Sequence, residues 1–173
     1  MNQFFQLLRA DAARYVHRGG WARNVGFWIS TTHRISEWAR QEPRAMRRYA
    51  ALIPLAGLTK FWRATTGVCI LAGASFGPGL CIPRARSMMI GRVRAGENCL
   101  ISDHVTIGTN ANANEVAIMG SDVEIGPGAC ILGPVEIGDG VRVRANAVVS
   151  HNVLPGAEVV AATVQLCCSS KRA

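Results

Sequence analysis

The chain has 173 residues, of which 49% are hydrophobic, and it carries a net charge of +8. This length suffices for one domain with an appended element, and no stretch reaches the roughly 20 consecutive apolar residues of a membrane span. The excess charge lies in residues 1–66, which hold 11 Lys and Arg against 3 Asp and Glu, whereas residues 67–173 hold 8 of each. No basic run is dense and no nucleic-acid-binding motif is present, so we expect a solvated helical surface and no nucleic-acid partner.

The basic N-terminal segment is predicted to be α-helical. An amphipathic pattern indicates a first helix over residues 2–18 and a second over 24–41. A third is expected over 44–62, with a kink or break at Pro54 and Gly57. Its apolar run is too short to cross a bilayer. With arginines nearby it can make peripheral contact with a membrane, although packing against the rest of the chain or a partner subunit is commoner.

Residues 119–154 repeat with a period of six. Each unit opens on an apolar residue and has a small or β-branched residue at its fifth place; the opening residues are Met119, Ile125, Ile131, Ile137, Val143 and Val149. The opening residue can point into a narrow core, while Gly, Asn, Asp and Pro allow turns between short strands. One unit cannot bury its own apolar face, so neighbouring units must stack. The pattern predicts a β-helix rather than a β-sandwich, whose strands recur about every 8–12 residues with period-two alternation.

The period extends towards the N-terminus, which predicts a β-helix over residues 67–160 and a C-terminal tail over 161–173. The earlier opening residues are Ile70, Phe76 and Ile82, then, after one extra residue, Met89, Ala95, Ile101 and Ile107. The polar stretch 109–116 is interpreted as a protruding loop or a weak rung.

The cysteines favour a reduced, cytoplasmic setting. None of the six forms a CxxC pair typical of zinc sites, and four lie in the repeat where a small hydrophobic residue would serve. The N-terminus does not read as a signal peptide, because charged residues follow too soon.

With the repeat and the helices in place, the chain resembles the serine acetyltransferase branch of the hexapeptide acyltransferases. The resemblance rests on residues 8–15, 27–38, 73–82 and 98–108, and its style is nearest to the short members, several of which are associated with exopolysaccharide clusters. It implies a left-handed parallel β-helix that forms a homotrimer or a dimer of trimers, with active sites between subunits. It also implies acetyl transfer from acetyl-CoA, without a metal, to a small-molecule hydroxyl of serine, a related amino acid or a sugar.

Such a reaction needs a general base, and a His with a near-neutral pKa is the usual one. The family places its His two residues after the apolar position held here by Ile82, where this chain has Arg84, which stays protonated at working pH. Ile101 follows Ile82 by one coil and one residue, so Asp103 and His104 are expected one rung, about 4.8 Å, from Arg84. We assign His104 as the candidate base and Asp103 as its candidate orienting residue; a polar corner without catalytic role is the alternative.

Five further residues are candidates for binding the substrates. Arg84 and Arg86 are candidates for holding an anionic acceptor or a CoA phosphate. Glu115 lies in the polar loop and is a candidate for reaching a neighbouring subunit's site. Arg142 and Arg144 are candidates for CoA contacts, because relatives bind the pantetheine arm in the later coils. For each, an ordinary solvated corner or loop residue is the alternative.

Two other functions are compatible with a β-helix of this kind. A non-catalytic relative could keep the fold for binding or assembly after losing the base at Arg84. A γ-type carbonic anhydrase shares the fold but needs three His ligands for its metal, and the repeat holds only His104 and His151. The second interpretation is therefore set aside.

Overall fold

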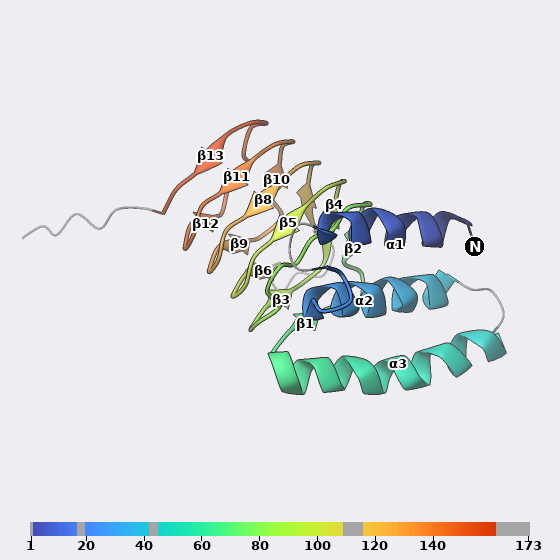
Figure 1. The fold of residues 1–173 in the computed structure, drawn as a ribbon. Coiled ribbons are helices and arrows are strands. Elements are labelled where there is room, and N and C mark those ends of the chain that lie inside the picture. Colours follow the sequence, from blue (N-terminus) through green and yellow to red (C-terminus); the bar gives the residue numbers. More distant parts are fainter. Residues whose placement is uncertain (1, 17–19, 42–44, 109–115, 162–173) are drawn as a thin grey trace, which may run out of the picture.

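The structure, a computed structural model, describes residues 2–16, 20–41, 45–108 and 116–161. In this part of the chain three helices precede thirteen short strands, and Figure 1 shows the helices gathered at one end of the stacked strands. The helices are α1 (Asn2–Arg14), α2 (Val25–Gln41) and α3 (Ala45–Thr66). The strands are β1 (Cys69–Ile70), β2 (Ser75–Phe76), β3 (Met89–Ile90), β4 (Val93–Ala95), β5 (Leu100–Ile101), β6 (Thr106–Gly108), β7 (Ala117–Met119), β8 (Glu124–Ile125), β9 (Cys130–Leu132), β10 (Glu136–Ile137), β11 (Arg142–Val143), β12 (Val148–Val149) and β13 (Glu158–Val159).

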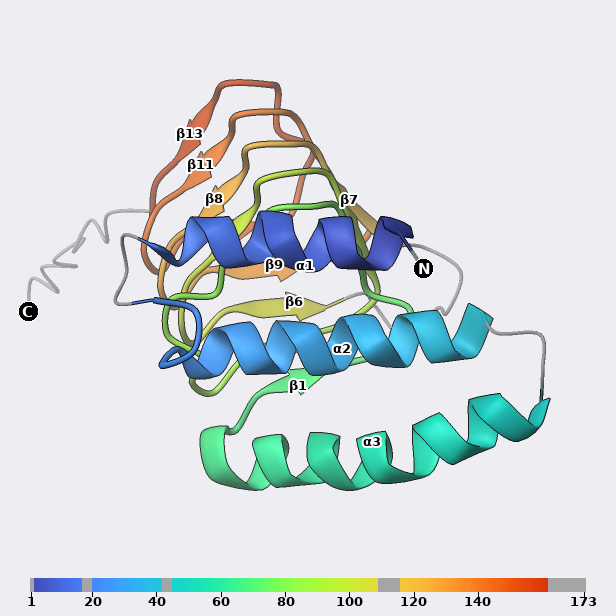
Figure 2. The same ribbon diagram turned by 45° about the vertical axis from the view of Figure 1, so that its right-hand side comes forward.

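The strands form three parallel sheets, one on each face of a triangular prism that Figure 2 shows nearly end-on. Sheet 1 has the order β1-β3-β6-β9-β12, sheet 2 the order β10-β7-β4-β2, and sheet 3 the order β13-β11-β8-β5. Cys130 pairs with Val148, 18 residues later, so one coil visits each face once in three units of six. The predicted left-handed β-helix with a helical N-terminal segment is confirmed.

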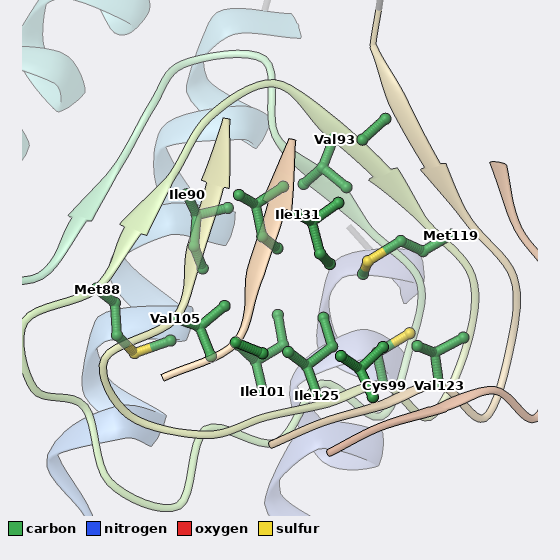
Figure 3. Close-up of a cluster of buried hydrophobic side chains, with 14 of the residues drawn as sticks. Met88, Ile90, Val93, Cys99, Ile101, Val105, Met119, Val123, Ile125 and Ile131 are labelled. Atoms are coloured by element: carbon green, nitrogen blue, oxygen red, sulfur yellow. The ribbon is translucent and has the colours of Figure 1, made fainter. Parts of the chain in front are cut away.

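The opening residues of the repeat fill the interior of the prism. Ile107, Ile125 and Ile131 are fully buried, and Figure 3 shows the aliphatic side chains pointing into the core from all three faces. Each such side chain stabilises the fold by roughly 1.5–3 kcal/mol relative to an exposed one. Gly, Asn and Asp between the strands turn the chain at the corners.

Met89 does not take the inward position that the spacing predicts. It is 54% exposed, and the inward positions belong to its neighbours Met88 and Ile90, which are 1% and 0% exposed. Ile90 pairs with Ile107, 17 residues later, so this coil is one residue short and the inward register shifts by one. Because side chains alternate along a strand, a shift by one residue moves Met89 to the outer face.

The interruption of the repeat lies between β6 and β7. Ile107 pairs with Ile131, 24 residues later, so this coil carries six residues more than the 18-residue coils. The loop itself, with Glu115, lies outside the described residues, which end at Gly108 and resume at Val116.

Two of the predicted helices differ in extent. α1 ends at Arg14 rather than at residue 18, and Gly20, with φ +84°, donates its N–H back to the carbonyl of Tyr15 at 3.1 Å. α3 continues through Pro54 to Thr66, so of the predicted kink or break the break is absent, and Figure 2 shows the helix bending towards its N-terminal end. A proline removes only one helical hydrogen bond, and α3 lies along α2, whose packing offsets that loss. No helix among the described residues is long and apolar enough to cross a membrane.

A buried ion pair fixes the helices to the first coil. The Asp11 carboxylate accepts hydrogen bonds from both Nε and Nη2 of Arg34, at 2.6 and 3.0 Å. Neither residue is more than 4% exposed. Arg34 also donates to the carbonyls of Phe76 and Gly77, and Asp11 accepts backbone N–H groups of the same turn. α1 and α2 are thus tied to each other and to the start of the prism, which positions the groove described next.

Candidate functional site

A groove opens where the helical segment meets the first two coils of the prism. It is formed by the loop before α2, the last turn of α3 and two successive corners of the β-helix. Its lining residues are Arg23, Asn24, Val25, Gly26, Thr65, Thr66, Pro83, Arg84, Ala85, Arg86, Ser87, Asp103 and His104. Four of the candidate site residues therefore come together here.

The two corners are consecutive rungs of one edge of the prism, as the spacing predicts. The N–H of His104 donates to the carbonyl of Arg86 at 2.9 Å, and the backbone carbonyl of Asp103 in turn accepts the N–H of Gly128 in the next rung at 3.0 Å. The first of these hydrogen bonds places Arg86 beside His104, and Arg84 lines the same groove. The charged side chains of both corners thus share one groove.

His104 has a left-handed backbone conformation, with φ +59°. The matching corner positions of the neighbouring rungs, Ser87, Gly128 and Asn146, also have positive φ. Among residues with a side chain, Asn, Asp and His adopt this conformation most readily. The position is therefore first of all a turn, and any catalytic role of His104 is added to that structural one.

The imidazole of His104 lies in the groove beside a carboxylate. Its Nδ1 is 3.5 Å from Oδ2 of Asp103, slightly longer than a hydrogen bond, and the two side chains are 58% and 22% exposed. A carboxylate beside Nδ1 favours the tautomer with the proton on that nitrogen, which leaves the lone pair of Nε2 free to accept a proton. This arrangement suits a general base with an orienting acid.

Three arginines make the groove cationic. Arg23, Arg84 and Arg86 are all exposed, and none of them forms an ion pair with another described residue. Asp103 is the one acidic residue in the lining. Guanidinium groups bind carboxylates and phosphates through paired hydrogen bonds, so the groove is suited to an anion.

Arg142 and Arg144 lie elsewhere, on and just after β11 of sheet 3. Arg142 Nε is 3.8 Å from a carboxylate oxygen of Glu124, and Arg144 Nε donates to the carboxylate of Glu158. All four side chains are about half exposed or more, so these pairs are screened by water. A CoA phosphate at this place would have to compete with both carboxylates.

Sequence reasoning missed the wall that the helical segment contributes. Asn24 donates from Nδ2 to the carbonyl of Pro83 at 3.1 Å and accepts the N–H of Gly26 through Oδ1 at 2.9 Å. A side chain on Gly26 would clash with the carbonyl oxygen of Ile82, so the helix begins in direct contact with the corner. Asn24 before an amphipathic run is a recognisable helix cap, but nothing local shows that it meets residue 83.

A second, smaller pocket lies between α2, α3 and β1, and it holds none of the candidate residues. His33 lines it, and its Nε2 lies 2.8 Å from the carbonyl oxygen of Ala74. Burial lowers the pKa of His33 below its ordinary value. Among the described residues no group of three His, Cys, Asp or Glu could hold a metal ion.

Comparison with known proteins agrees with the repeat and the fold. The bacterial transferase hexapeptide model (six repeats) matches residues 117–151. Serine acetyltransferase of Neisseria gonorrhoeae in complex with serine is 25% identical, with a TM-score of 0.77 over 95% of this chain and 69% of that one. The soybean apoenzyme is also 25% identical, with a TM-score of 0.71 over 92% and 70% of the two chains.

A serine acetyltransferase in complex with CoA has the same fold. It is 22% identical, with a TM-score of 0.73 over 92% of this chain and 70% of that one. No curated protein sequence matches the chain.

Proposed function

Because the chain is a hexapeptide-repeat protein with the fold of serine acetyltransferases, we propose that it is an O-acetyltransferase that uses acetyl-CoA. The observation that carries the proposal is the groove that His104 and Asp103 share with three arginines. The acceptor is a small molecule with a hydroxyl group, either serine, a related amino acid or a sugar.

In the proposed reaction Nε2 of His104 accepts the proton of the acceptor hydroxyl while its oxygen attacks the thioester carbonyl. The tetrahedral intermediate then breaks its C–S bond and expels the CoA thiolate, which takes the proton back from His104. Asp103 keeps the other ring nitrogen protonated and stabilises the imidazolium that forms between the two steps. Neither a metal nor an acyl-enzyme is needed.

Acetyl-CoA enters as a co-substrate. Arg142 and Arg144 are the proposed contacts for its phosphates, which requires that they exchange Glu124 and Glu158 for the ligand. Both pairs are exposed, so this exchange costs little. Glu115 remains a candidate for completing the site of a neighbouring subunit.

The outer face of sheet 1 supports assembly into a homotrimer. Its outward residues in register are uncharged: Cys69, Met89, Thr106, Cys130 and Val148. The corresponding rows of sheets 2 and 3 include Arg94 and Glu136, and Glu124, Arg142 and Glu158. An apolar face on an elongated prism suits contact with further copies of itself, as a trimer or a dimer of trimers. A reduced, cytoplasmic setting and peripheral membrane contact of the helices remain predictions.

The alternative is a non-catalytic relative, and one observation favours it. His104 occupies a corner position whose neighbours are turn residues, so its presence has a purely structural explanation. In that case the protein binds ligands or assembles without turning over a thioester.

Thiol release from acetyl-CoA separates the two proposals. Purified protein is assayed with serine, homoserine and sugar acceptors, alongside His104→Asn and, as a matched control, His151→Asn, an exposed histidine outside the groove. We expect acceptor-dependent release that His104→Asn removes and His151→Asn leaves unchanged. No release with any acceptor, together with no binding of acetyl-CoA, would support the non-catalytic relative.

A further inference from the structure

The cationic groove continues into an exposed aromatic surface. Val25 lines the groove and is 42% exposed, and Trp28, one helical turn later, is 43% exposed. Trp28 donates its indole N–H to the carbonyl of Ala22 at 3.0 Å, and its ring centroid lies 6.2 Å from that of Trp21, which is 45% exposed. The loop that carries Arg23 into the groove therefore also carries one exposed tryptophan, Trp21, and the first turn of α2 carries the second, Trp28.

Exposed tryptophans need a physical reason, because two large apolar rings in water are unfavourable unless something covers them. These rings are held by an indole hydrogen bond and by contact with the buried Phe27, at 5.4 and 5.8 Å between centroids. A rigid aromatic face with a polar edge offers packing area at little cost in conformational entropy. It is suited to the flat C–H face of a sugar ring.

The arginines indicate the charge of the same ligand. Arg84 and Arg86 line the same groove as His104, and the acceptor hydroxyl must reach that imidazole. In acetyl-CoA the phosphates lie at the far end of the pantetheine arm from the thioester. Cations next to the base are therefore placed for the acceptor rather than for the CoA phosphates, and they favour an acceptor that carries a carboxylate.

We propose that the acceptor is an acidic saccharide, whose carboxylate binds Arg84 and Arg86 while a sugar ring packs on the surface formed by Val25, Trp28 and Trp21. This inference rests on the proposed function, because the saccharide is an acceptor only if the protein transfers an acetyl group. Binding of the saccharide itself does not require turnover. It selects the sugar from the acceptor classes above and adds that it is anionic.

The direct test is binding without acetyl-CoA, measured by NMR titration with methyl β-D-glucuronide and its neutral counterpart, methyl β-D-glucoside. We expect the glucuronide to bind at least about tenfold more tightly, with an affinity that falls as salt rises. Arg86→Gln, or Arg84→Gln should the first variant fail to fold, should remove this preference. Arg94→Gln, which removes an exposed arginine on β4 of sheet 2, should keep it.

The aromatic half of the proposal has its own matched pair. Trp28→Leu should weaken binding of both glycosides, whereas Trp38→Leu, at the far end of α2 and also 43% exposed, should weaken neither. Equal binding of glucuronide and glucoside, or no binding of either by the wild-type protein, overturns the inference. A Trp28→Leu protein that binds both glycosides as the wild-type protein does also overturns the inference. That result is expected if the tryptophan rings instead cover a contact with a second copy of the chain.

Two further readouts separate this inference from its alternatives. If Arg86→Gln weakens binding of CoA but not of dephospho-CoA, and leaves glucuronide binding intact, the arginines hold a cofactor phosphate and the inference fails. If the protein releases thiol with serine as acceptor and Arg86→Gln does not alter that release, the proposed acetyltransferase activity is supported and the proposed acidic saccharide is refuted. If glucuronide binding depends on Arg86 but no thiol is released, the saccharide site is supported and the proposed acetyltransferase activity is refuted.

Discussion

Replacing Asp11 by Asn tests how the helical segment is held against the prism. The substitution keeps the shape and one acceptor oxygen, but it leaves the Arg34 guanidinium, 4% exposed, without a counter-charge. Breaking a buried ion pair in this way costs about 3–5 kcal/mol, against a total stability of about 5–15 kcal/mol for a typical domain. For a chain of this size each kcal/mol lowers Tm by about 2–4 °C, so we expect a fall of roughly 6–20 °C.

The measurement is thermal unfolding followed by circular dichroism at fixed protein concentration. The matched control is Arg144→Gln, which breaks an arginine–carboxylate pair whose side chains are 61% and 47% exposed, and which should cost less than about 1 kcal/mol. An Asp11→Asn protein no less stable than the Arg144→Gln protein would refute the reasoning. The double variant Asp11→Asn, Arg34→Met should recover stability relative to Asp11→Asn, because it removes the uncompensated charge.

Three further predictions concern catalysis, assembly and pH. His104→Asn should lower thiol release by about 10²–10⁴-fold with an unchanged Tm, because Asn tolerates the positive φ; a lost fold would point to a structural role instead. Val148→Glu on sheet 1 should shift the protein to monomers in size-exclusion chromatography with light scattering, whereas Ile118→Glu on sheet 2 should not. His33 has a lowered pKa in the folded protein, so the unfolded state binds more protons: stability should be full above the unfolded pKa of about 6.5 and fall as pH drops below it. His33→Gln should flatten this dependence in chemical unfolding; an equally steep curve would contradict it.

The prism could be predicted from the sequence because the pattern that specifies it repeats over short stretches of the chain. Each opening residue of the repeat, such as Ile125 or Ile131, is buried by neighbours one coil away, so a period of six carries the register. The same reasoning placed Asp103 and His104 one rung from Arg84. It went wrong at Met89, because one coil is a residue short and the apolar run Met88 to Ile90 fits either register.

The groove could be predicted only in part. Its floor comes from successive corners, but its wall depends on contacts such as that from Asn24 to Pro83, 59 residues apart, which have no periodic signal. The left-handed conformation of His104 was also not foreseen, although Asn146 holds the matching position two rungs later. That conformation changes the choice of variant, because Ala would add backbone strain to any catalytic loss.

The most direct test of the central claim is the transfer of an isotopically labelled acetyl group from acetyl-CoA to an acceptor hydroxyl, followed by mass spectrometry of the acceptor. Wild type and His104→Asn are compared at equal concentration after both are shown to be folded. We expect a labelled O-acetyl product with the wild type and none above background with His104→Asn. An identical yield from both proteins would remove His104 as the base, and no product from either, with any acceptor tried, would contradict the assignment as an acetyltransferase.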